Sequence, residues 1–502
     1  MKEWLLRASA KTAHAGAVMA GGGLLAICGV ALGVLIVALS QAEIRWLVYG
    51  CAGIAFVAAV LMVRNQAGLL WLTFVFALQL DVTIRFLYLY QESEGLSFPL
   101  PVWIGLALLM WALANRCWRP VRWGGRLMAA MMGLAATTVL AISYSSYRFI
   151  GWAVLLTQVE LCFIFFLALN YVRSANQLRH ALDILFLVLI VQSLIYYVQT
   201  ALGLTFTLTG EAIEAGSRLP RPGGTVATHP SGFCNFMLPL MLIAVAHFLA
   251  PATNRARSWY IALAIVLSVG ALVLTLTRAS WAAFALGLLW IALFGFRRRL
   301  LSPFKFAAIG VIALTAGLAG APKMMERIAG APVKSSYDER AALMEMAKRV
   351  IVAHPLVGVG PGAYDFMYKK YLTGDLATRW QWTVHNHYLL RSAETGIPGG
   401  AMFVLLLLLA LRQAMRLRKS SNRLVSATAL GWSAGIVSQL FSMYWDMWTF
   451  FTGQSMFWFL LGIVSAAEQI SREEAMRSGS INESVNLTSK ENERIGVAGV
   501  SA

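Results

Sequence analysis

Long apolar runs alternate with short polar connections along nearly the whole chain. A helix needs about 20 mostly apolar residues to cross a bilayer, and most of these runs approach that length. The runs that we interpret as spans cover residues 15–40, 46–63, 67–90, 100–115, 127–143, 149–170, 181–203, 232–250, 258–276, 279–296, 304–320, 398–412, 424–444 and 449–467. The pattern predicts an all-α polytopic membrane protein with about 12–14 transmembrane helices.

Basic residues are concentrated in every second connection between the predicted spans. With the N-terminus inside the cell, the even-numbered connections carry 18 Lys and Arg residues, and the short odd-numbered connections carry five. This is the bias expected of connections that face the cytoplasm. It accounts for the net charge of +18 without nucleic acid, for which the chain lacks a basic patch with interleaved aromatic residues.

Composition narrows the class further. The chain is 59% hydrophobic and only 13% charged, which excludes disorder and an ordinary soluble enzyme. Its five cysteines are scattered without metal-ligand or redox spacing, so we expect neither a disulfide framework nor a metal site.

Two predicted outer connections are too long to be tight turns, namely residues 204–231 and the loop 321–397. The pattern therefore predicts N-terminal membrane helices over 1–203 and a catalytic membrane region over 204–467 that includes this large loop. The polar tail 468–502 is predicted to be disordered and cytoplasmic.

The large loop contains an amphipathic segment, YDERAALMEMAKRVIVAHPLVGVGPGAY, beginning at Tyr337. Asp338 is a plausible N-cap, and Pro355 ends the helix. Its apolar face comprises Leu343, Met346, Ala347, Val350 and Ile351. Such a helix lies either on the membrane surface or over the mouth of a cavity.

Glycines follow the amphipathic helix in the sequence GVGPG, which contains Gly358, Gly360 and Gly362. They predict a compact turn whose backbone N–H groups are able to meet an anion. A Gly-Pro cluster is also typical of a turn that binds nothing.

Two histidines, His385 and His387, precede the next apolar run in VHNHYLLRSAETGIPGG. A neutral imidazole at the outer surface is able to accept a proton from a hydroxyl group near neutral pH. The alternative is an interfacial histidine that hydrogen-bonds Asn386 or the backbone.

Three arginines are expected at the same outer face. Arg278 lies in TLTRASW between two spans, Arg221 lies in a Pro/Gly-rich segment, and Arg340 is near the start of the amphipathic helix. Guanidinium groups bind phosphate oxygens in bidentate fashion, so this set suits a diphosphate. The alternative for Arg278 is a turn arginine that reaches lipid headgroups. Asp81 and Arg85 have the i, i+4 spacing of a structural ion pair.

Four segments resemble the O-antigen ligase and polymerase superfamily of bacterial envelope glycosyltransferases. They are RPGGTVATHPSGF, TLTRASW, ERAALMEMAKRVIVAHPLVGVGPGAY and HNHYLLRSAETGIPGG. Their order and their placement around a large outer loop agree with the family across residues 216–400. The chain has about two more predicted spans than the usual twelve, which leaves the subfamily open.

The resemblance implies metal-independent, cofactor-free transfer of a glycan from undecaprenyl diphosphate at the periplasmic face of the bacterial inner membrane. The lipid A core is the acceptor in ligases. Carried over by position, His385, Arg278 and Arg340 are the implied catalytic residues, and His387 falls at a variable position. Arg221, Asn386 and Gly360 are the implied substrate-binding residues.

Three other functions remain open from the sequence. A polymerase of the same superfamily transfers the glycan to another lipid-linked repeat unit. A membrane transporter, for example of the bicarbonate type, would favour internal repeats and charges at the midplane. The sequence has no repeat that we identify, and its polar residues gather near one surface. An envelope scaffold would not need the histidine and arginines.

Overall fold

A computed structural model of the chain describes residues 58, 60, 62, 63, 65–86, 96–115, 122–203, 222–227, 229–251, 254–296, 302–330, 333–372, 382–448 and 451–498. The chain divides into two compact units, Met1–Leu70 and Trp71–Ala502. The predicted spans 15–40 and 46–63 lie almost wholly outside the described residues. The fold that positions the site belongs to the second unit.

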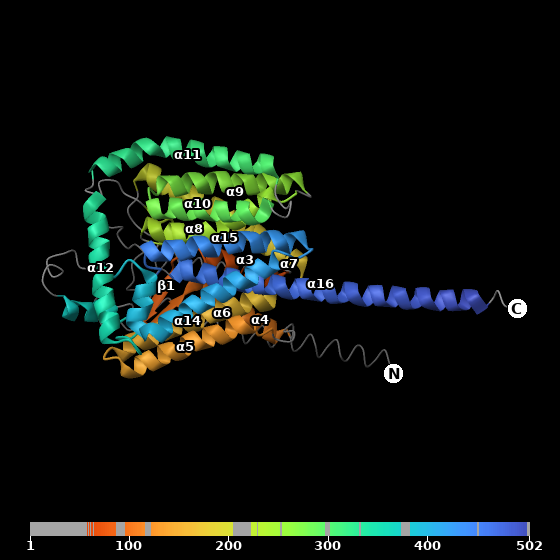
Figure 1. The fold of residues 1–502 in the computed structure, drawn as a ribbon, viewed down its shortest axis with the longest axis horizontal. Coiled ribbons are helices and arrows are strands. Elements are labelled where there is room, and N and C mark those ends of the chain that lie inside the picture. The colour runs from red at the N-terminus through yellow and green to blue at the C-terminus, as the bar shows by residue number, and fades with distance from the viewer. Residues whose placement is uncertain are drawn as a thin grey trace. The chain divides into compact units, whose positions relative to one another are not determined.

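Helices make up nearly all of the described structure (Figure 1). The helices are α3 (Gln66–Ala77), α4 (Leu100–Ala114), α5 (Arg126–Tyr144), α6 (Arg148–Tyr171), α7 (Ala175–Leu202), α8 (Pro230–Leu249), α9 (Arg255–Leu274), α10 (Arg278–Phe296), α11 (Pro303–Gly330), α12 (Val333–Ala353), α13 (Tyr364–Met367), α14 (His387–Leu417), α15 (Arg423–Trp445) and α16 (Phe451–Ala498), with a 3-10 turn at Tyr368–Tyr371. Eight of these helices, α5 to α10, α14 and α15, are long and apolar enough to cross a membrane. The predicted all-α polytopic membrane fold is confirmed.

The predicted span 67–90 is wrong beyond its first half. Helix α3 ends at Ala77, and the chain then forms strand β1 (Thr83–Phe86), which pairs antiparallel with β2 (Leu96–Pro99). The backbone N–H of Asp81 donates to the carbonyl of Thr225 at 2.9 Å, outside any helix. Because Arg85 lies in a strand, the helical i, i+4 pairing suggested for Asp81 and Arg85 does not apply.

The connections between the long helices separate into two groups at opposite ends of the helices. Among the described residues, the loop end, at the left of Figure 1, comprises 145–147, 225–227, 229, 275–278, 353–372, 382–386 and 445–448. The basic end comprises residues 122–126, 173–179, 251, 254–257, 302–305 and 418–423. At the loop end, Ser145 Oγ donates to the Val359 carbonyl at 3.0 Å. At the basic end, Lys305 Nζ donates to the carbonyl of Phe248, in the last turn of α8, at 2.8 Å. This arrangement agrees with the alternation predicted from the spans and their charges.

Helix α8 is the most enclosed of the eight apolar helices, because 94% of its most apolar stretch is buried. Polar contacts fix its first turns against α15, because Ser442 Oγ donates to Asn235 Oδ1 at 2.6 Å and Gln439 Nε2 donates to the Asn235 carbonyl. Cys234 contacts Thr275 Oγ1 at 3.4 Å. Helix α8 therefore ties the turn before α10 to the end of α15.

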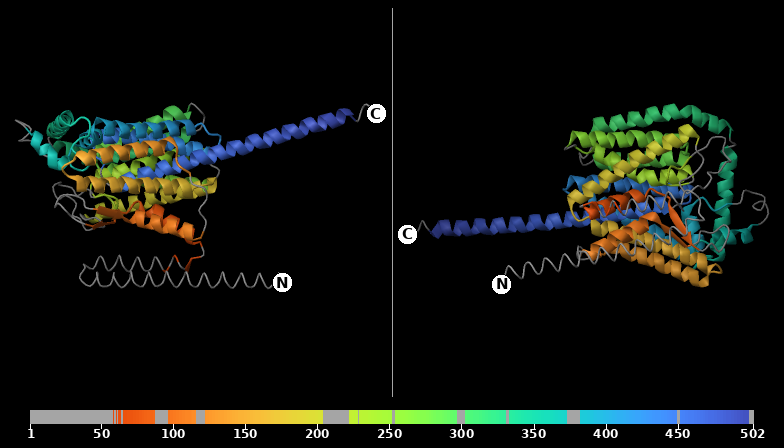
Figure 2. Two further views of the ribbon diagram at one scale, coloured as in Figure 1. Left: turned by 90° about the horizontal axis from the view of Figure 1, so that it is seen from below. Right: turned by 180° about the vertical axis from the view of Figure 1, so that it is seen from behind.

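Helix α12 lies across the ends of the spanning helices, as two views agree (Figures 1 and 2). It begins at Val333, so Asp338 is inside the helix and is not its N-cap. The predicted apolar face is correct: Leu343, Met346, Ala347 and Val350 have no exposed surface. They pack against the glycine turn, α13 and the start of α14. The apolar face of α12 therefore packs against protein.

Helix α16 continues as one helix to Ala498, where the sequence predicts a disordered tail from residue 468. The first turns of this extension are held at the basic end. Arg122 forms an ion pair with Glu473, and Asn422 Nδ2 donates to Glu474 Oε2 at 2.9 Å. These contacts account for the continuation past residue 468, because they join the extension to the bundle.

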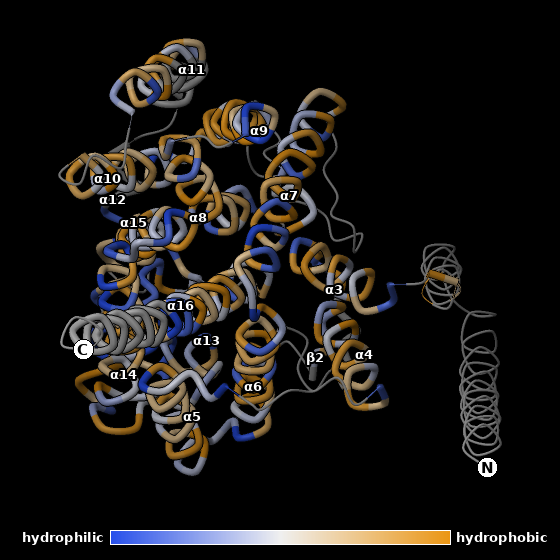
Figure 3. Tube along the Cα trace, turned by 90° about the vertical axis from the view of Figure 1, so that its right-hand side faces the viewer, coloured by the Kyte–Doolittle hydropathy of each residue, from blue (hydrophilic) through white to orange (hydrophobic). Residues whose placement is uncertain are grey.

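Hydrophobic residues predominate along the helices (Figure 3), and many large apolar side chains are exposed. Trp152 on α6 and Leu263 on α9 are 52% and 50% exposed, and Leu293 on α10 is 50% exposed. A soluble protein rarely exposes so much contiguous apolar surface. Contact with lipid explains this exposed apolar surface, and such contact is expected for helices that are apolar enough to cross a membrane.

Candidate active site

Two motifs of the long loop lie side by side at the loop end. The N–H of Gly360 donates to the carbonyl of Glu394 at 2.9 Å, and the N–H of Ile397 donates to the carbonyl of Pro355 at 2.8 Å. The glycine turn after α12 is thus bonded to the first turns of α14. The two segments are therefore adjacent in space, although the rest of the loop separates them in the sequence.

Glycine is required where the two backbones approach. At Gly358, with φ of 67°, an added Cβ would lie 2.3 Å from the carbonyl carbon of Glu394. At Gly396, with φ of 73° and ψ of 173°, it would lie 2.3 Å from the carbonyl oxygen of Leu356. Gly396 also divides α14 into two helical pieces. Side chains are excluded at both positions by sterics and by backbone conformation.

We expect Gly396→Ala to destabilise the protein by at least about 2 kcal/mol, because a backbone conformation that only glycine adopts would be combined with a clash against Leu356. The measurement is thermal unfolding of the purified protein. Gly310→Ala is the matched control, since nothing lies within 4 Å of a Cβ at that helical position. Equal unfolding temperatures for the two variants would show that the close approach is not tight.

The glycine turn binds an acidic side chain of the protein itself. The N–H of Gly362 donates to Glu394 Oε1 at 3.0 Å, and Arg391 Nη1 lies 3.9 Å from Glu394 Oε2. The resemblance implied that Gly360 binds substrate, but in the structure its N–H donates to the carbonyl of Glu394. Close packing against Ser145 instead explains this glycine, because a Cβ would lie 2.0 Å from Ser145 Oγ.

A cavity of about 790 Å³ opens beside this contact, between α6, α14 and the segments that join α13 to α14 and α15 to α16. Its polar lining includes Gln158, Asp365, Lys369, His387, Arg391 and Glu394. Ile150 and Val154 of α6 contribute an apolar wall, and Trp382 and Trp448 contribute aromatic surface. The volume is within the range of about 300–1,000 Å³ that is usual for small-molecule sites.

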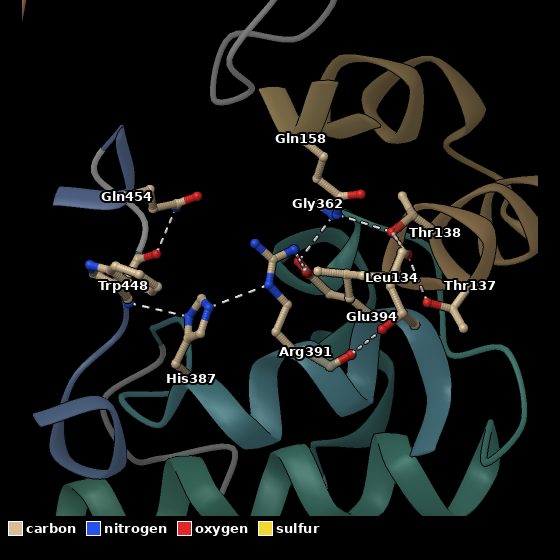
Figure 4. A network of polar contacts seen from close by, with 11 residues as sticks. Leu134, Thr137, Thr138, Gln158, Gly362, His387, Arg391, Glu394, Trp448 and Gln454 are labelled. Carbon is tan, nitrogen blue, oxygen red and sulfur yellow. Dashed lines mark hydrogen bonds and ion pairs between the residues drawn. The ribbon is translucent and has the colours of Figure 1, made fainter. Parts of the chain in front are cut away.

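Polar contacts order the cavity wall on α14 (Figure 4). The N–H of Trp448 donates to His387 Nδ1 at 3.2 Å, and Arg391 Nε approaches His387 Nε2 at 3.3 Å. Gln454 Nε2 donates to the Trp448 carbonyl at 2.8 Å. A neutral imidazole has one acceptor nitrogen and one N–H, so His387 accepts from one of these two donors at a time. The two contacts hold its ring between Trp448 and Arg391.

Sequence reasoning missed His387, Arg391 and Glu394 as a group. Their spacing of four and then three residues places them on one face of a helix. That spacing is present in HNHYLLRSAETG. The sequence alone did not indicate that a helix begins at His387, ahead of the break at Gly396. The cavity lining includes Thr383 and His387, on either side of His385, and does not include His385 itself.

His385 lies in the segment just before α14 and is half-buried. Its Nδ1 contacts the carbonyl of Thr383 at 3.0 Å. A carbonyl oxygen only accepts hydrogen bonds, so Nδ1 carries the proton and Nε2 has the lone pair that a base requires.

Electrostatics at His385 favour the neutral imidazole. Burial lowers the pKa of His385 below its ordinary value, and the positive charge of Arg340 lowers the pKa further. The carboxylate of Asp446, after α15, and the Thr383 carbonyl oppose these effects and raise the pKa. The structure thus brings Arg340 and His385 into electrostatic reach of each other, as two of the predicted catalytic residues.

The third predicted catalytic residue, Arg278, is not in direct contact with this histidine in the described part of the chain. Arg278 is exposed as the first residue of α10 at the loop end. It follows a turn in which Leu276 has φ of 52° and Thr275 contacts Cys234 of α8. No direct contact from Arg278 to His385 or Arg340 occurs among the side chains that the structure describes. Arg221 lies outside the described residues.

Asn386, implied as a substrate-binding residue, is almost fully buried and holds α14 in place. Its Oδ1 accepts from the N–H of Leu389 at 3.0 Å, which makes it the N-cap. Its Nδ2 donates to the carbonyl of Tyr444 at 3.2 Å. The residue therefore fixes the start of α14, and with it His385, relative to α15.

Glu394→Ala is expected to lower the free energy of unfolding by about 1–3 kcal/mol, because the partly buried Gly362 N–H loses its acceptor. Glu394→Gln keeps an oxygen there and should lose less. Thermal unfolding of the purified variants measures both. Glu345→Ala, an exposed residue of α12, is the control and should stay within about 0.5 kcal/mol of the original protein. Identical losses for Ala and Gln would argue against the contact.

Comparison with known proteins agrees with the resemblance drawn from the sequence. Residues 263–404 match the protein-family model described as O-antigen ligase. This stretch runs from within α9 to within α14 and includes Arg278, Arg340, His385 and the cavity residues of α14. No curated protein matches the sequence. The predicted resemblance is confirmed, and with the eight apolar helices it supports, at the family level, glycosyl transfer by a multi-pass membrane protein of polysaccharide biosynthesis.

Proposed function

We propose that the protein transfers a glycan from undecaprenyl diphosphate to the lipid A core at the periplasmic face of the bacterial inner membrane. One observation carries this proposal. A histidine held neutral, within electrostatic reach of Arg340, lies beside a large polar cavity inside the stretch that matches the O-antigen ligase family.

His385 acts as the general base in this reaction. The acceptor hydroxyl gives its proton to Nε2 while its oxygen bonds to the anomeric carbon of the donor sugar. The bond from that carbon to the diphosphate oxygen breaks, and the electron pair leaves with the diphosphate. Attack opposite the leaving group inverts the anomeric configuration. The lowered pKa of His385 keeps the base unprotonated at neutral pH.

Arginines stabilise the negative charge that develops on the departing diphosphate. Arg340 lies near His385, and Arg278 is exposed at the same end of the helices. Arg221 joins them as a binding residue in this proposal. Preplaced cations aimed at a developing charge are among the largest contributors to catalysis. The reaction needs no metal when guanidinium groups take this part.

The cavity holds sugar residues next to the reacting bond. Arg391, Glu394 and Gln158 offer donors and acceptors to hydroxyl groups, and the tryptophans at its wall offer flat apolar surface to sugar rings. This division of polar and aromatic lining is typical of a site that orients a polar ligand. The arginine bias of the basic end supports a cytoplasmic placement of that end, and in this proposal the cavity opens to the periplasm.

A deletion strain tests the proposal. Loss of the gene should remove long glycans from lipid A while full-length glycans accumulate on the undecaprenyl carrier. Complementation with the intact gene restores the surface glycan. If single repeat units remain on lipid A, the enzyme is a polymerase instead. Normal surface glycan in the deletion strain, including its capsule and exopolysaccharide, would contradict envelope glycosyl transfer.

A further inference from the structure

A second pocket, of about 220 Å³, lies at the basic end of the helices. It is formed by residues of α7, α8, α9 and α15 and by the connections beside them. A helix of 20 residues such as α8 is about 30 Å long, so the length of this helix separates the pocket from His385. The proposed reaction makes no use of it.

Three arginines from three different helices line this pocket: Arg179 of α7, Arg257 of α9 and Arg423 of α15. Arg179 and Arg423 are exposed, and Arg257 is half-buried. The nearby acids do not cancel this charge. Asp183 pairs with Arg257 Nε at 2.8 Å, and Glu474 accepts from Asn422 at the rim. The pocket therefore has an excess of positive charge.

Arg257 also has donor capacity that its partner does not use. Its Nη2 atom is buried, and no acceptor meets it within the described part of the chain. Asn254 and Asn422, which line the rim, cap α9 and α15 respectively. Two helix N-termini thus face the pocket rim, and their dipoles favour negative charge there. Planar guanidinium groups bind phosphate oxygens in pairs.

The pocket walls match the interfacial region of a membrane. Ile261, Leu424 and Ala427 supply apolar surface below the arginines, and His247, which contacts Thr428 Oγ1 at 3.0 Å, lies at the floor. Trp259, two residues after Arg257, is 68% exposed on the outside of α9. Tryptophan at this position is typical of the boundary between lipid and water.

We propose that this pocket binds a phosphate-bearing anion, for which the surroundings favour the headgroup of an anionic lipid in the cytoplasmic leaflet. Basic pockets between membrane helices on that side are suited to such headgroups. The arginines would contact phosphate oxygens, and the apolar wall would contact the glycerol and the first acyl carbons. The inference does not depend on the proposed glycosyl transfer, because it uses other residues at the other end of the helices.

The test compares two double variants of the full chain purified in detergent. Arg179→Gln with Arg423→Gln removes two pocket charges and leaves the Arg257–Asp183 ion pair intact. Arg255→Gln with Arg412→Gln is the matched control. Arg255 is at the basic end and Arg412 lies near the C-terminal end of α14; both are exposed and neither lines the pocket. Native mass spectrometry measures binding of phosphatidylglycerol and of diacylglycerol, which lacks the phosphate. Thermal unfolding with inorganic phosphate provides the second probe.

The original protein and the control should bind phosphatidylglycerol alike, and the pocket variant should bind it about 30-fold more weakly, since each basic residue near the membrane contributes about fivefold in affinity. Diacylglycerol should not distinguish the variants. If inorganic phosphate alone raises the unfolding temperature of all but the pocket variant, the site takes soluble phosphate. Equal behaviour of pocket and control variants with both probes would overturn the proposal.

Discussion

His385→Ala is expected to lower the rate of glycan transfer by about 10²–10⁴-fold, the usual effect of removing a general base. The imidazole lies in a loop segment just before α14, and Asn386, not His385, caps that helix. The variant should therefore insert and fold like the original protein. Transfer by the purified enzyme at saturating donor measures the effect.

His354→Ala is the matched control for this histidine. His354 also lies at the loop end, after α12, where its Nε2 contacts the hydroxyl of Tyr371 at 2.6 Å. It belongs to neither the cavity nor the arginine set. We expect its loss to leave the transfer rate within a few-fold of the original, on the order expected for a residue outside the site. Equal rates for the two alanine variants would remove His385 from the mechanism.

Arg340→Gln should lower the transfer rate by roughly 10²–10³-fold, because the departing diphosphate loses a preplaced cation. It should also change the pH dependence. A base works unprotonated, so the rate rises as pH rises through the pKa of His385. The charge of Arg340 lowers that pKa, and its removal should move the acid limb of the pH–rate profile to higher pH.

Two further variants test how the charges near His385 set its pKa. Arg340→Lys keeps the positive charge, so the acid limb should stay in place while the rate falls for want of a bidentate contact. Asp446→Asn removes the carboxylate that raises the pKa of His385, so the acid limb should move to lower pH. Acid limbs that coincide in all three variants would show that these residues do not act on His385.

All eight described helices that are long and apolar enough to cross a membrane coincide with predicted spans, because bilayer crossing imposes a strong constraint on composition. The apolar face of α12 was also predictable, since Leu343, Met346, Ala347 and Val350 follow helical spacing and are all buried. The hairpin of β1 and β2 was not, because a mostly apolar run does not distinguish a strand from the second half of a span. Tertiary hydrogen bonds, such as that of Asp81 to Thr225, fix the chain there.

The site was predictable in its residue types more than in its contacts. The histidine motif and the glycine motif were both evident, yet nothing in either motif states that Gly362 binds the carboxylate of Glu394. That pairing depends on the return of the chain after a long loop. Likewise, the resemblance implied Asn386 and Gly360 as substrate-binding residues, and in the structure both lie in close backbone contacts.

The most direct measurement of the central claim is transfer by the purified protein in proteoliposomes, supplied with a glycan on undecaprenyl diphosphate and a lipid A core acceptor. Without any added metal, the account predicts release of undecaprenyl diphosphate and a product whose new bond has the inverted anomeric configuration, with neither formed by His385→Ala. Retention of configuration, or equal product from the His385→Ala protein, would contradict it.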